Sequence, residues 1–326
     1  MEGIKYAPVI IPTLNRYVHF KRCLESLERC TGAELTEVYV GLDYPPSEKY
    51  VDGWKKIDKY LIVKETENSF KKLHVIRHKN NCGVGHPGSN GNLLSQYVQE
   101  MYDRYIFTED DNEFSPNFLE YINNGLRLFK NNPRVIAISG YCYLYKIKGV
   151  DKNAYPGYNF SAWGVGHWRD KIPEYMKVGA QEYLDDILNS WKKSWRVYRS
   201  NPAWLNGLML MKFKNTIHDD TMWCADCLLN DKVSIYPKVS KVRNWGNDGT
   251  GEHCKKIISQ VAEQEIDENI HFEFDEGIDQ LPAVNFLPYL KPELYKWVGA
   301  LLRYLFYRAI HKDIFAYINV HKNVRV

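Results

Sequence analysis

The sequence predicts an α/β protein with a mostly parallel sheet flanked by helices and a helical extension at its C-terminal end. Short apolar runs that end at Pro, Gly or Asp alternate with segments of helical periodicity, and polar clusters directly follow several of these runs. Strands that alternate with helices form parallel sheets covered on both faces. With 44% hydrophobic and 25% charged residues, the 326-residue chain has a globular composition, which excludes wholesale disorder.

The elements of the first half follow a regular order. Phe20, Leu24 and Leu27 recur at intervals of three and four residues, as on one face of a helix. The expected strands are residues 7–12, 37–42, 73–77 and 104–107, and the helices between them end near residues 29, 60 and 101.

The second half is less regular. Ser115 and Pro116 predict the start of a helix, with Ser as its cap and Pro in its first turn. Further strands are expected at 135–140 and 233–237, and a helical pattern resumes from 292 to about 315. Residues 151–215 are dense in Tyr, Trp and Gly and are interpreted as loops and short helices, and residues 244–254 as a Gly-rich polar loop.

Charge and cysteine content exclude several classes of protein. A net charge of +3 argues against the broad basic field of a nucleic-acid binder. Seven thinly spread Cys argue against a disulfide-built scaffold. Without a signal pattern or an apolar run of about 20 residues, the expected location is cytoplasmic. The 24 Tyr and 9 Trp suit surfaces that hold sugars, bases or lipid headgroups.

Polar residues follow each of the four N-terminal strands. They are residues 13–16, Asp43, residues 77–81 and the acidic triplet 109–111. Because ligands bind at the carboxyl ends of parallel strands, we expect these four loops to converge on one crevice.

The acidic triplet has two interpretations. Carboxylate oxygens hold hard divalent cations, with water and substrate phosphates completing the shell. Acidic residues also favour the first turn of a following helix. Ser115 already offers a cap, and adjacent carboxylates repel one another, but both interpretations stay open at this point.

These motifs resemble those of GT-A fold glycosyltransferases. The run VIIPTLNR (9–16), together with residues 22–27 and Asp43, is similar to the nucleotide-binding start of that fold. The run EDDNEFSPNFLEY (109–121) is similar to the acidic metal motif of N-acetylglucosaminyltransferase I. The segment from VSIYPK (233–238) through residues 242–246 to residues 252–253 resembles bacterial family-2 sugar transferases of surface-polysaccharide clusters.

The resemblance implies a domain organisation. It covers about residues 7–254 and implies a GT-A catalytic domain over 1–255, with a nucleotide-binding half (1–112) and an acceptor half (113–255). Residues 256–326 would form a helical, basic and aromatic extension.

The resemblance also implies roles for the acidic residues. Asp111 would bind Mn²⁺ or Mg²⁺, Asp110 would contact the ribose or the sugar, and Glu109 would support the donor sugar. HDDTMW (218–223) resembles the segment that supplies the general base, which would be Asp219 or Asp220, with Asp219 preferred. Weaker candidates for the base are Asp226 and the pair at 185–186, and paired acids also simply favour a helix start.

The nucleotide site is implied in the same way. Asp43 would bind the uracil, and Arg16 would lie near the base and phosphates. Four further residues would line the uridine or hold the loop beside the base: Pro12, Thr13, Arg77 and Asn81. The turn DYPP (43–46) departs from the Asp-Gly-Ser common in family-2 enzymes, which leaves the nucleotide open.

Two later loops complete the candidate site. Trp163 and Gly164 lie in a Gly- and Trp-rich stretch and would line the donor sugar, unless Trp163 only packs in the core. His253 lies in a late polar loop and would be an additional metal ligand, although a lone His is more often structural.

The C-terminal tail is basic and aromatic. Residues 285–326 contain seven Lys or Arg and two acidic residues, a net charge of +5, so the rest of the chain is slightly acidic. Such a helix fits an anionic membrane surface, at the inner face of the membrane, through residues 285–315. Docking on the domain or on a second subunit, as in a homodimer, is the alternative.

The expected function is that of a metal-dependent inverting glycosyltransferase in surface polysaccharide synthesis. It would transfer a hexosyl or N-acetylhexosaminyl group from a UDP-sugar to a glycan or lipid-linked acceptor, with no nucleic-acid partner. The alternatives are a sugar nucleotidyltransferase, for which the expected Gly-rich phosphate loop near the first strand is missing, and a catalytically silent sugar-binding protein of the same fold.

Overall fold

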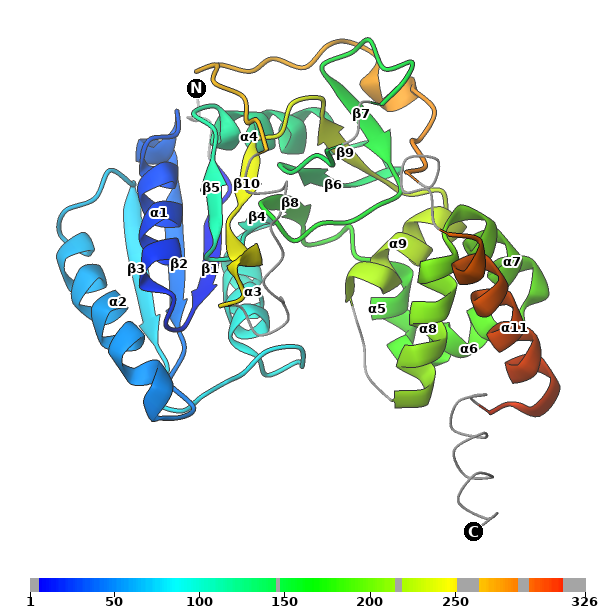
Figure 1. Ribbon diagram of the computed structural model, residues 1–326. Helices are drawn as coiled ribbons and strands as arrows, with labels where there is room; N and C mark the ends of the chain where they lie inside the picture. The colour runs from blue at the N-terminus through cyan, green and yellow to red at the C-terminus, as the bar shows by residue number, and fades with distance from the viewer. Residues whose placement is uncertain (1–5, 145–146, 215–218, 251–263, 287–292, 313–326) are drawn as a thin grey trace. The chain divides into compact units, whose positions relative to one another are not determined.

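The chain folds into two compact units, which the computed structural model describes over residues 6–144, 147–214, 219–250, 264–286 and 293–312 (Figure 1). The α/β unit comprises residues 1–156, 161–171 and 234–282. The helical unit comprises residues 157–160, 172–233 and 283–326. Neither unit is one continuous stretch of chain, and the division expected at residue 255 stays a prediction.

The α/β unit is built on an eight-stranded sheet with the order β3-β2-β1-β4-β8-β6-β9-β7. The four N-terminal strands run parallel, with Val9 of β1 opposite Val38 of β2 and Ile106 of β4. Their bounds are β1 Val9–Thr13, β2 Glu37–Leu42, β3 Lys72–Arg77 and β4 Arg104–Phe107. The predicted α/β class with a mostly parallel, Rossmann-like sheet is confirmed.

Three helices connect these parallel strands: α1 Tyr17–Glu28, α2 Val51–Lys64 and α3 Asn90–Met101. Helix α3 packs on β1, β2 and β4, while α1 packs on α2 (Figure 1). Val9, Ile10 and Ile11 are fully buried because helices cover the sheet, which explains why β1 is an uninterrupted apolar run. Phe20 and Leu24 form the buried stripe of α1, as their spacing predicts.

The second half of this unit adds shorter elements. Helix α4 spans Phe118–Leu128 and begins two residues later than predicted. The strands β6 Val135–Ser139 and β9 Val233–Pro237 confirm two predictions, and β7 is Ala154–Gly157.

Four strands were not predicted, and one of them is β7, whose residues lie in the stretch interpreted as loops and short helices. Strand β8, Val165–Trp168, lies between β4 and β6 and is antiparallel to both, so the expected loop is wrong for these residues. Strands β5 Asn112–Phe114 and β10 Val242–Asn244 form a separate antiparallel pair. Each of the four has only three or four residues, too few to show a period of two in the sequence.

The helical unit contains α5 Glu174–Val178, α6 Ala180–Asn189, α7 Trp191–Ser200, α8 Pro202–Lys214, α9 Asp219–Leu229 and α11 Leu294–Ile310 (Figure 1). Their buried apolar residues form one core cluster, which includes Leu184 of α6, Val197 of α7 and Leu208 of α8. Tyr304 and Tyr307 of α11 belong to the same cluster. The predicted C-terminal helix therefore packs on this unit.

Candidate functional site

The centre of the candidate site is a buried cluster of two carboxylates and one guanidinium. Arg16 follows β1 and is the N-cap residue of α1, while Asp110 and Asp111 follow β4. The Arg16 guanidinium pairs with both carboxylates, and its Nη1 lies 2.7 Å from Oδ2 of Asp111. Thr13 donates a hydrogen bond of 2.7 Å from its hydroxyl to Oδ2 of Asp110. The structure thus joins four of the predicted residues in one network.

The electrostatics of this cluster follow from burial. Both aspartate side chains are only 6% exposed. Burial, with the neighbouring charge of Asp111, raises the pKa of Asp110 above its ordinary value although Arg16 and Thr13 lower it. Burial lowers the pKa of Arg16, but the two carboxylates outweigh it and raise that pKa overall. The guanidinium stays charged, and with both carboxylates ionised the cluster has two negative charges against one positive charge.

The helix-cap interpretation of the acidic triplet is wrong. Strand β5 separates the triplet from α4, whose N-cap residue is Asn117. Ser115 does not cap the helix either, because its hydroxyl donates to Oδ1 of Asn117 at 3.0 Å.

Strand β10 supports Asp111 from a distant part of the sequence. Asn244 donates from Nδ2 to Oδ1 of Asp111 at 2.7 Å and to Oδ1 of Asn112 at 2.9 Å. The backbone N–H of Trp245 donates to the carbonyl of Asp111 at 2.9 Å. A Cβ atom on Gly246 would lie 2.1 Å from Oδ2 of Asp111, so only glycine fits there. Sequence reasoning missed these roles, although the run Asn-Trp-Gly after a short apolar segment was a usable signal.

A second network surrounds Asp43 at the end of β2. Its carboxylate accepts from the side chain of Asn81 at 3.1 Å and from the backbone N–H groups of Tyr44, Cys82 and Gly83 at 2.7–3.0 Å. The two predicted residues Asp43 and Asn81 are therefore in contact. Since four donors already use the two carboxylate oxygens, Asp43 fixes the loop at 81–83, and a base would have to compete for it.

A third contact joins Glu109 and Trp163. The indole N–H of Trp163 donates to Oε2 of Glu109 at 2.9 Å, and the Trp163 ring packs edge-on against Tyr141. Gly164 follows with a φ of +68°, and a Cβ there would lie 2.9 Å from Phe118 and Val242 side-chain atoms. The indole N–H of Trp163 thus orients the carboxylate of Glu109, which is part of the acidic triplet.

Two predicted nucleotide-site residues lie apart from these networks. Arg77 pairs with Asp58 and Glu65, at 2.7 and 2.9 Å, where it ties β3 to α2. Its guanidinium therefore has a structural role in this state. Pro12 lies in β1, close to Gly91 of α3: a Cβ atom added to Gly91 would lie 3.6 Å from Cγ of Pro12.

The candidate bases lie in the helical unit. Asp219 begins α9 and is followed by the exposed Asp220. The side chain of Asp219 and all of His253 lie outside the described residues. Among the weaker candidates, Asp226 is 1% exposed and accepts from Asn230 at 2.9 Å. Burial raises its pKa although the hydrogen bond from Tyr183 lowers it, and these donors give it a structural role.

The other weak candidates form ion pairs. Asp185 pairs with Lys212 at 2.7 Å, and Asp186 pairs with Lys193. Both are therefore partnered on the surface of the helical unit.

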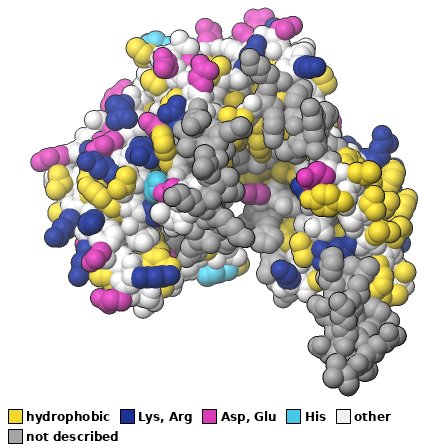
Figure 2. All heavy atoms as spheres, in the orientation of Figure 1, with side chains coloured by type: hydrophobic (Ala, Val, Ile, Leu, Met, Phe, Trp, Pro, Cys, Tyr) yellow, Lys and Arg dark blue, Asp and Glu magenta, His cyan; other side chains and the backbone are white. Residues whose placement is uncertain are grey.

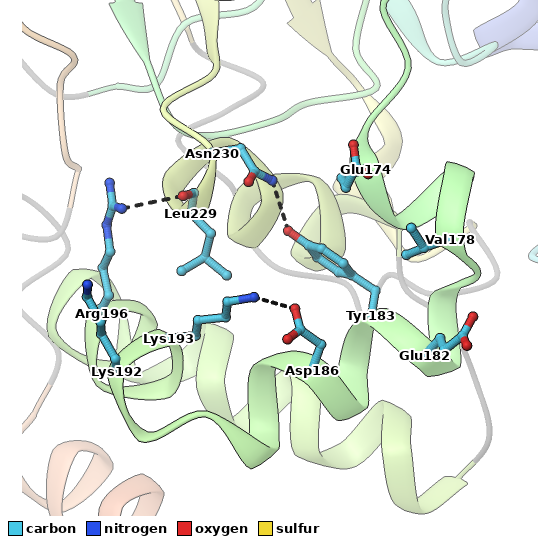
Figure 3. A pocket seen from close by; sticks show the side chains of 10 residues that line it. All are labelled: Glu174, Val178, Glu182, Tyr183, Asp186, Lys192, Lys193, Arg196, Leu229 and Asn230. Atoms are coloured by element: carbon cyan, nitrogen blue, oxygen red, sulfur yellow. Dashed lines mark hydrogen bonds and ion pairs between the residues drawn. The ribbon is translucent and has the colours of Figure 1, made fainter.

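The helical unit has a pocket of about 560 Å³ between α5, α6, α7 and the end of α9 (Figure 3). Its charged walls interact with one another: Lys193 pairs with Asp186, and Arg196 donates to the carbonyl of Leu229 at 3.4 Å. Asn230 donates to the hydroxyl of Tyr183 at 3.1 Å. These contacts join α6, α7 and α9.

The donor chemistry of the α/β unit suits a hard divalent cation. Asp110 and Asp111 offer carboxylate oxygens with an excess negative charge, which Mg²⁺ and Mn²⁺ prefer. Over the described residues, no three His, Cys, Asp or Glu side chains are grouped as metal ligands. A cation would therefore need oxygens from water and a phosphorylated ligand to complete its shell.

Comparison with protein-family models finds no match for the sequence, and comparison with curated proteins finds none. Among solved structures, the chain is similar to S. aureus TarS, with 16% identity over 49% of this chain and 28% of that chain (TM-score 0.31). The match to TarS 1–349 in complex with UDP has 16% identity over 56% and 49% of the two chains (TM-score 0.32).

A further similar structure is the mannosyltransferase PcManGT from Pyrobaculum calidifontis, in complex with GDP-Man and Mn²⁺. It has 12% identity over 69% of this chain and 74% of that chain, with a TM-score of 0.35. The matched region spans less than two thirds of either TarS chain. At these low TM-scores, the function of this protein has to be argued from its own site.

Proposed function

We propose that this protein is a metal-dependent inverting glycosyltransferase that moves a sugar from a UDP-activated donor to a glycan or lipid-linked acceptor. The observation that supports it is the buried Arg16–Asp110–Asp111 cluster at the carboxyl ends of β1 and β4. A hydrogen-bonded loop beside β2 and a carboxylate oriented by Trp163 lie at the same edge of the sheet. Such an arrangement suits a nucleoside diphosphate with an attached sugar.

Each group of residues would have a separate role. The loop at 81–83, fixed by Asp43, would contact the base, and Glu109 would accept hydrogen bonds from the donor sugar. Arg16 would offset negative charge on the diphosphate. Asp111, and with it His253, would hold Mn²⁺ or Mg²⁺. The bound cation would supply positive charge for the diphosphate as it leaves.

The transfer is a single displacement. The acceptor hydroxyl oxygen bonds to the anomeric carbon while the bond from that carbon to the diphosphate oxygen breaks. The hydroxyl proton passes to a carboxylate, and Asp219 is the preferred base, with Asp220 as the second choice. One displacement inverts the anomeric configuration.

The test measures nucleotide binding and turnover separately. UDP and UDP-sugars are titrated into the purified protein with Mn²⁺, and hydrolysis or transfer is followed as UDP release. Asp111→Ala is expected to abolish metal-dependent binding, whereas Asp219→Asn keeps binding and loses turnover. Glu268→Gln, an exposed acid of the α/β unit, is the matched control and should change neither.

Three outcomes contradict the proposal. If no nucleotide sugar binds with metal present, the protein is not this transferase. Release of pyrophosphate instead of UDP would favour a nucleotidyltransferase, and binding without any turnover would favour a silent sugar-binding protein. Loss of binding in Asp219→Asn would count against its role as the base.

A further inference from the structure

Helix α11 has an apolar face on its outer side. Its inner side buries Ala300, Tyr304 and Tyr307 in the core of the helical unit. The side opposite to these residues is made of large apolar side chains that are exposed. They are Leu294 (77% exposed), Val298 (47%), Leu302 (56%) and Leu305 (43%). Their spacing of four, four and three residues puts them on one stripe of the helix.

Helix α7 adds two exposed tryptophans beside α11. Trp191 and Trp195 are 50% and 41% exposed, and their rings stack with centroids 6.1 Å apart. Trp191 also packs against Tyr304 of α11, at 5.6 Å between ring centroids. We call the six residues Leu294, Val298, Leu302, Leu305, Trp191 and Trp195 the outer apolar face. Figure 2 shows hydrophobic side chains gathered on this part of the helical unit.

The two helices that carry the outer apolar face contain basic but no acidic residues, and the acids beside them, Glu293 and Asp186, each pair with one lysine. Helix α7 contains four basic residues and α11 contains three, and neither helix contains an acidic residue. Lys192, Arg196 and Arg199 are exposed on α7. Lys296 is exposed on α11 and pairs with Glu293, which precedes the helix, at 2.7 Å.

This pattern selects between the two occupants that an exposed apolar face can have. A second copy of the chain, related by a twofold axis, would bring two sets of cations together, and their repulsion would destabilise the dimer. An anionic lipid surface offers an apolar layer for the leucines, an interface for the tryptophans, and opposite charge for the lysines and arginines. The charge complementarity therefore favours the lipid surface.

We propose that the outer apolar face docks the protein on the surface of an anionic lipid bilayer, with α11 lying in the interface. None of the described helices is long and apolar enough to cross a bilayer, so the contact is peripheral. Leu294 and the three residues that follow on its stripe enter the acyl boundary, while Trp191 and Trp195 lie at the headgroup level. This inference does not depend on the transferase activity.

The test is flotation of the full chain with vesicles. One set contains phosphatidylcholine alone, and the other contains phosphatidylcholine with about one third phosphatidylglycerol. The wild-type protein is expected to float with the anionic vesicles, and more weakly with added salt. Val298→Glu with Leu302→Glu is expected to weaken partitioning at least about a hundredfold, because two apolar side chains leave the acyl boundary.

The matched control places the same charges on another exposed apolar site. Ile62→Glu with Val63→Glu changes two side chains of α2 that are 56% and 51% exposed, and it should leave flotation unchanged. All four substituted residues are exposed, so circular dichroism should show folded proteins. Flotation of the Val298/Leu302 variant at the wild-type level would overturn the proposal.

A separate variant tests the contribution of the basic residues to binding. Lys192→Gln with Arg199→Gln should weaken binding to anionic vesicles about fivefold per charge and leave the residual binding to neutral vesicles unchanged. Equal flotation of the wild type on both kinds of vesicle would overturn the anionic part of the proposal. A wild-type dimer in light scattering that does not float, and that Val298→Glu with Leu302→Glu converts to monomer, would assign the face to a second copy instead.

Discussion

The α/β unit contains two buried charged clusters that differ in their charge balance. In the first, the guanidinium of Arg16 is shared by Asp110 and Asp111, which leaves one negative charge without a protein cation. In the second, Lys241 pairs with Asp267 alone, one charge against one. The carboxylates of both clusters are almost completely removed from solvent.

The surroundings of the second cluster complete it. Asp267 also accepts from the side chain of Asn117 and the backbone N–H of Asn269, both at 3.0 Å. The Lys241 ammonium lies 4.3 Å from the ring centroid of Phe272. Burial raises the pKa of Asp267, but the hydrogen bonds from Lys241 and Asn117 outweigh it and lower that pKa. For Asp110 the balance is reversed, and its pKa is raised.

The difference teaches which cluster is structural. A balanced pair whose carboxylate accepts from Lys241, Asn117 and Asn269 anchors the segment around 267 beside α4 and leaves no uncompensated charge for a ligand. An unbalanced cluster at the carboxyl ends of parallel strands retains negative charge where ligands bind.

The largest expected effect follows from removing each cation. Arg16→Met and Lys241→Met each leave buried negative charge, so each should lower the free energy of unfolding by about 3–5 kcal/mol. At about 100 times its dissociation constant for Arg16→Met, Mn²⁺ should restore roughly 2.7 kcal/mol in that variant, whereas Lys241→Met should gain no more than the wild-type protein, because its Asp110–Asp111 site is unchanged. Urea unfolding of the two variants and the wild type, with and without Mn²⁺, measures these gains. A gain in Lys241→Met above that of the wild type, or no gain in Arg16→Met, would remove the contrast between the clusters.

A smaller effect is expected from a change of shape without a change of charge. Gly246→Ala places a methyl group against Oδ2 of Asp111, so the carboxylate or the backbone must move. The expected cost is about 1–3 kcal/mol of unfolding free energy, together with weaker metal-dependent UDP binding. Both are read from urea unfolding and titration calorimetry.

The matched glycine for this prediction is Gly299. It lies in α11 with no atom within 4 Å of an added Cβ, so Gly299→Ala should stabilise the protein by up to about 1 kcal/mol and leave UDP binding unchanged. Normal UDP binding in Gly246→Ala would mean that the position of Asp111 is not important for the site.

The smallest effect is the loss of one hydrogen bond. Trp163→Phe keeps the ring but removes the N–H that orients Glu109, at a cost of about 1 kcal/mol, so turnover should fall roughly fivefold. Trp245→Phe is the matched control, because its indole N–H donates to Glu113 at 2.8 Å in the same way. Steady-state rates with a UDP-sugar should fall in the first variant only. An equal fall in both would indicate general loosening of the unit.

Sequence reasoning predicted the long, regular elements well and the short ones poorly. Strands β1 to β4 were recognised because each is an apolar run between helices, a local pattern that burial imposes on both faces of the sheet. Strand β8 was missed because four residues, Val165 to Trp168, contain a Gly and a His and show no period. His167 is buried as a neutral side chain, and burial lowers its pKa to about 4, so its polarity in the sequence was misleading.

In the candidate site, too, local features were predicted and long-range contacts were not. Thr13, Arg16, Asp110 and Asp111 were placed together correctly, because the carboxyl ends of adjacent parallel strands meet at one edge. The support that Asn244 and Gly246 give to Asp111 was not predicted, since it depends on the antiparallel pairing of β5 with β10, which places Asn244 opposite Asn112, 132 residues away in the sequence.

The sequence by itself determined the class of fold, the edge of the sheet where the polar residues gather, and the basic, aromatic character of the last helix. These features are local, because strand burial, helix periodicity and charge composition are each expressed within a few consecutive residues. Only the tertiary structure decided that Arg77 ties β3 to α2, that Asp43 holds the loop at 81–83, and that α11 turns its leucines outward. Those outcomes depend on which groups, distant in the sequence, compete for the same hydrogen-bonding or ion-pairing partner. A single stretch of sequence does not show which distant groups will lie beside it.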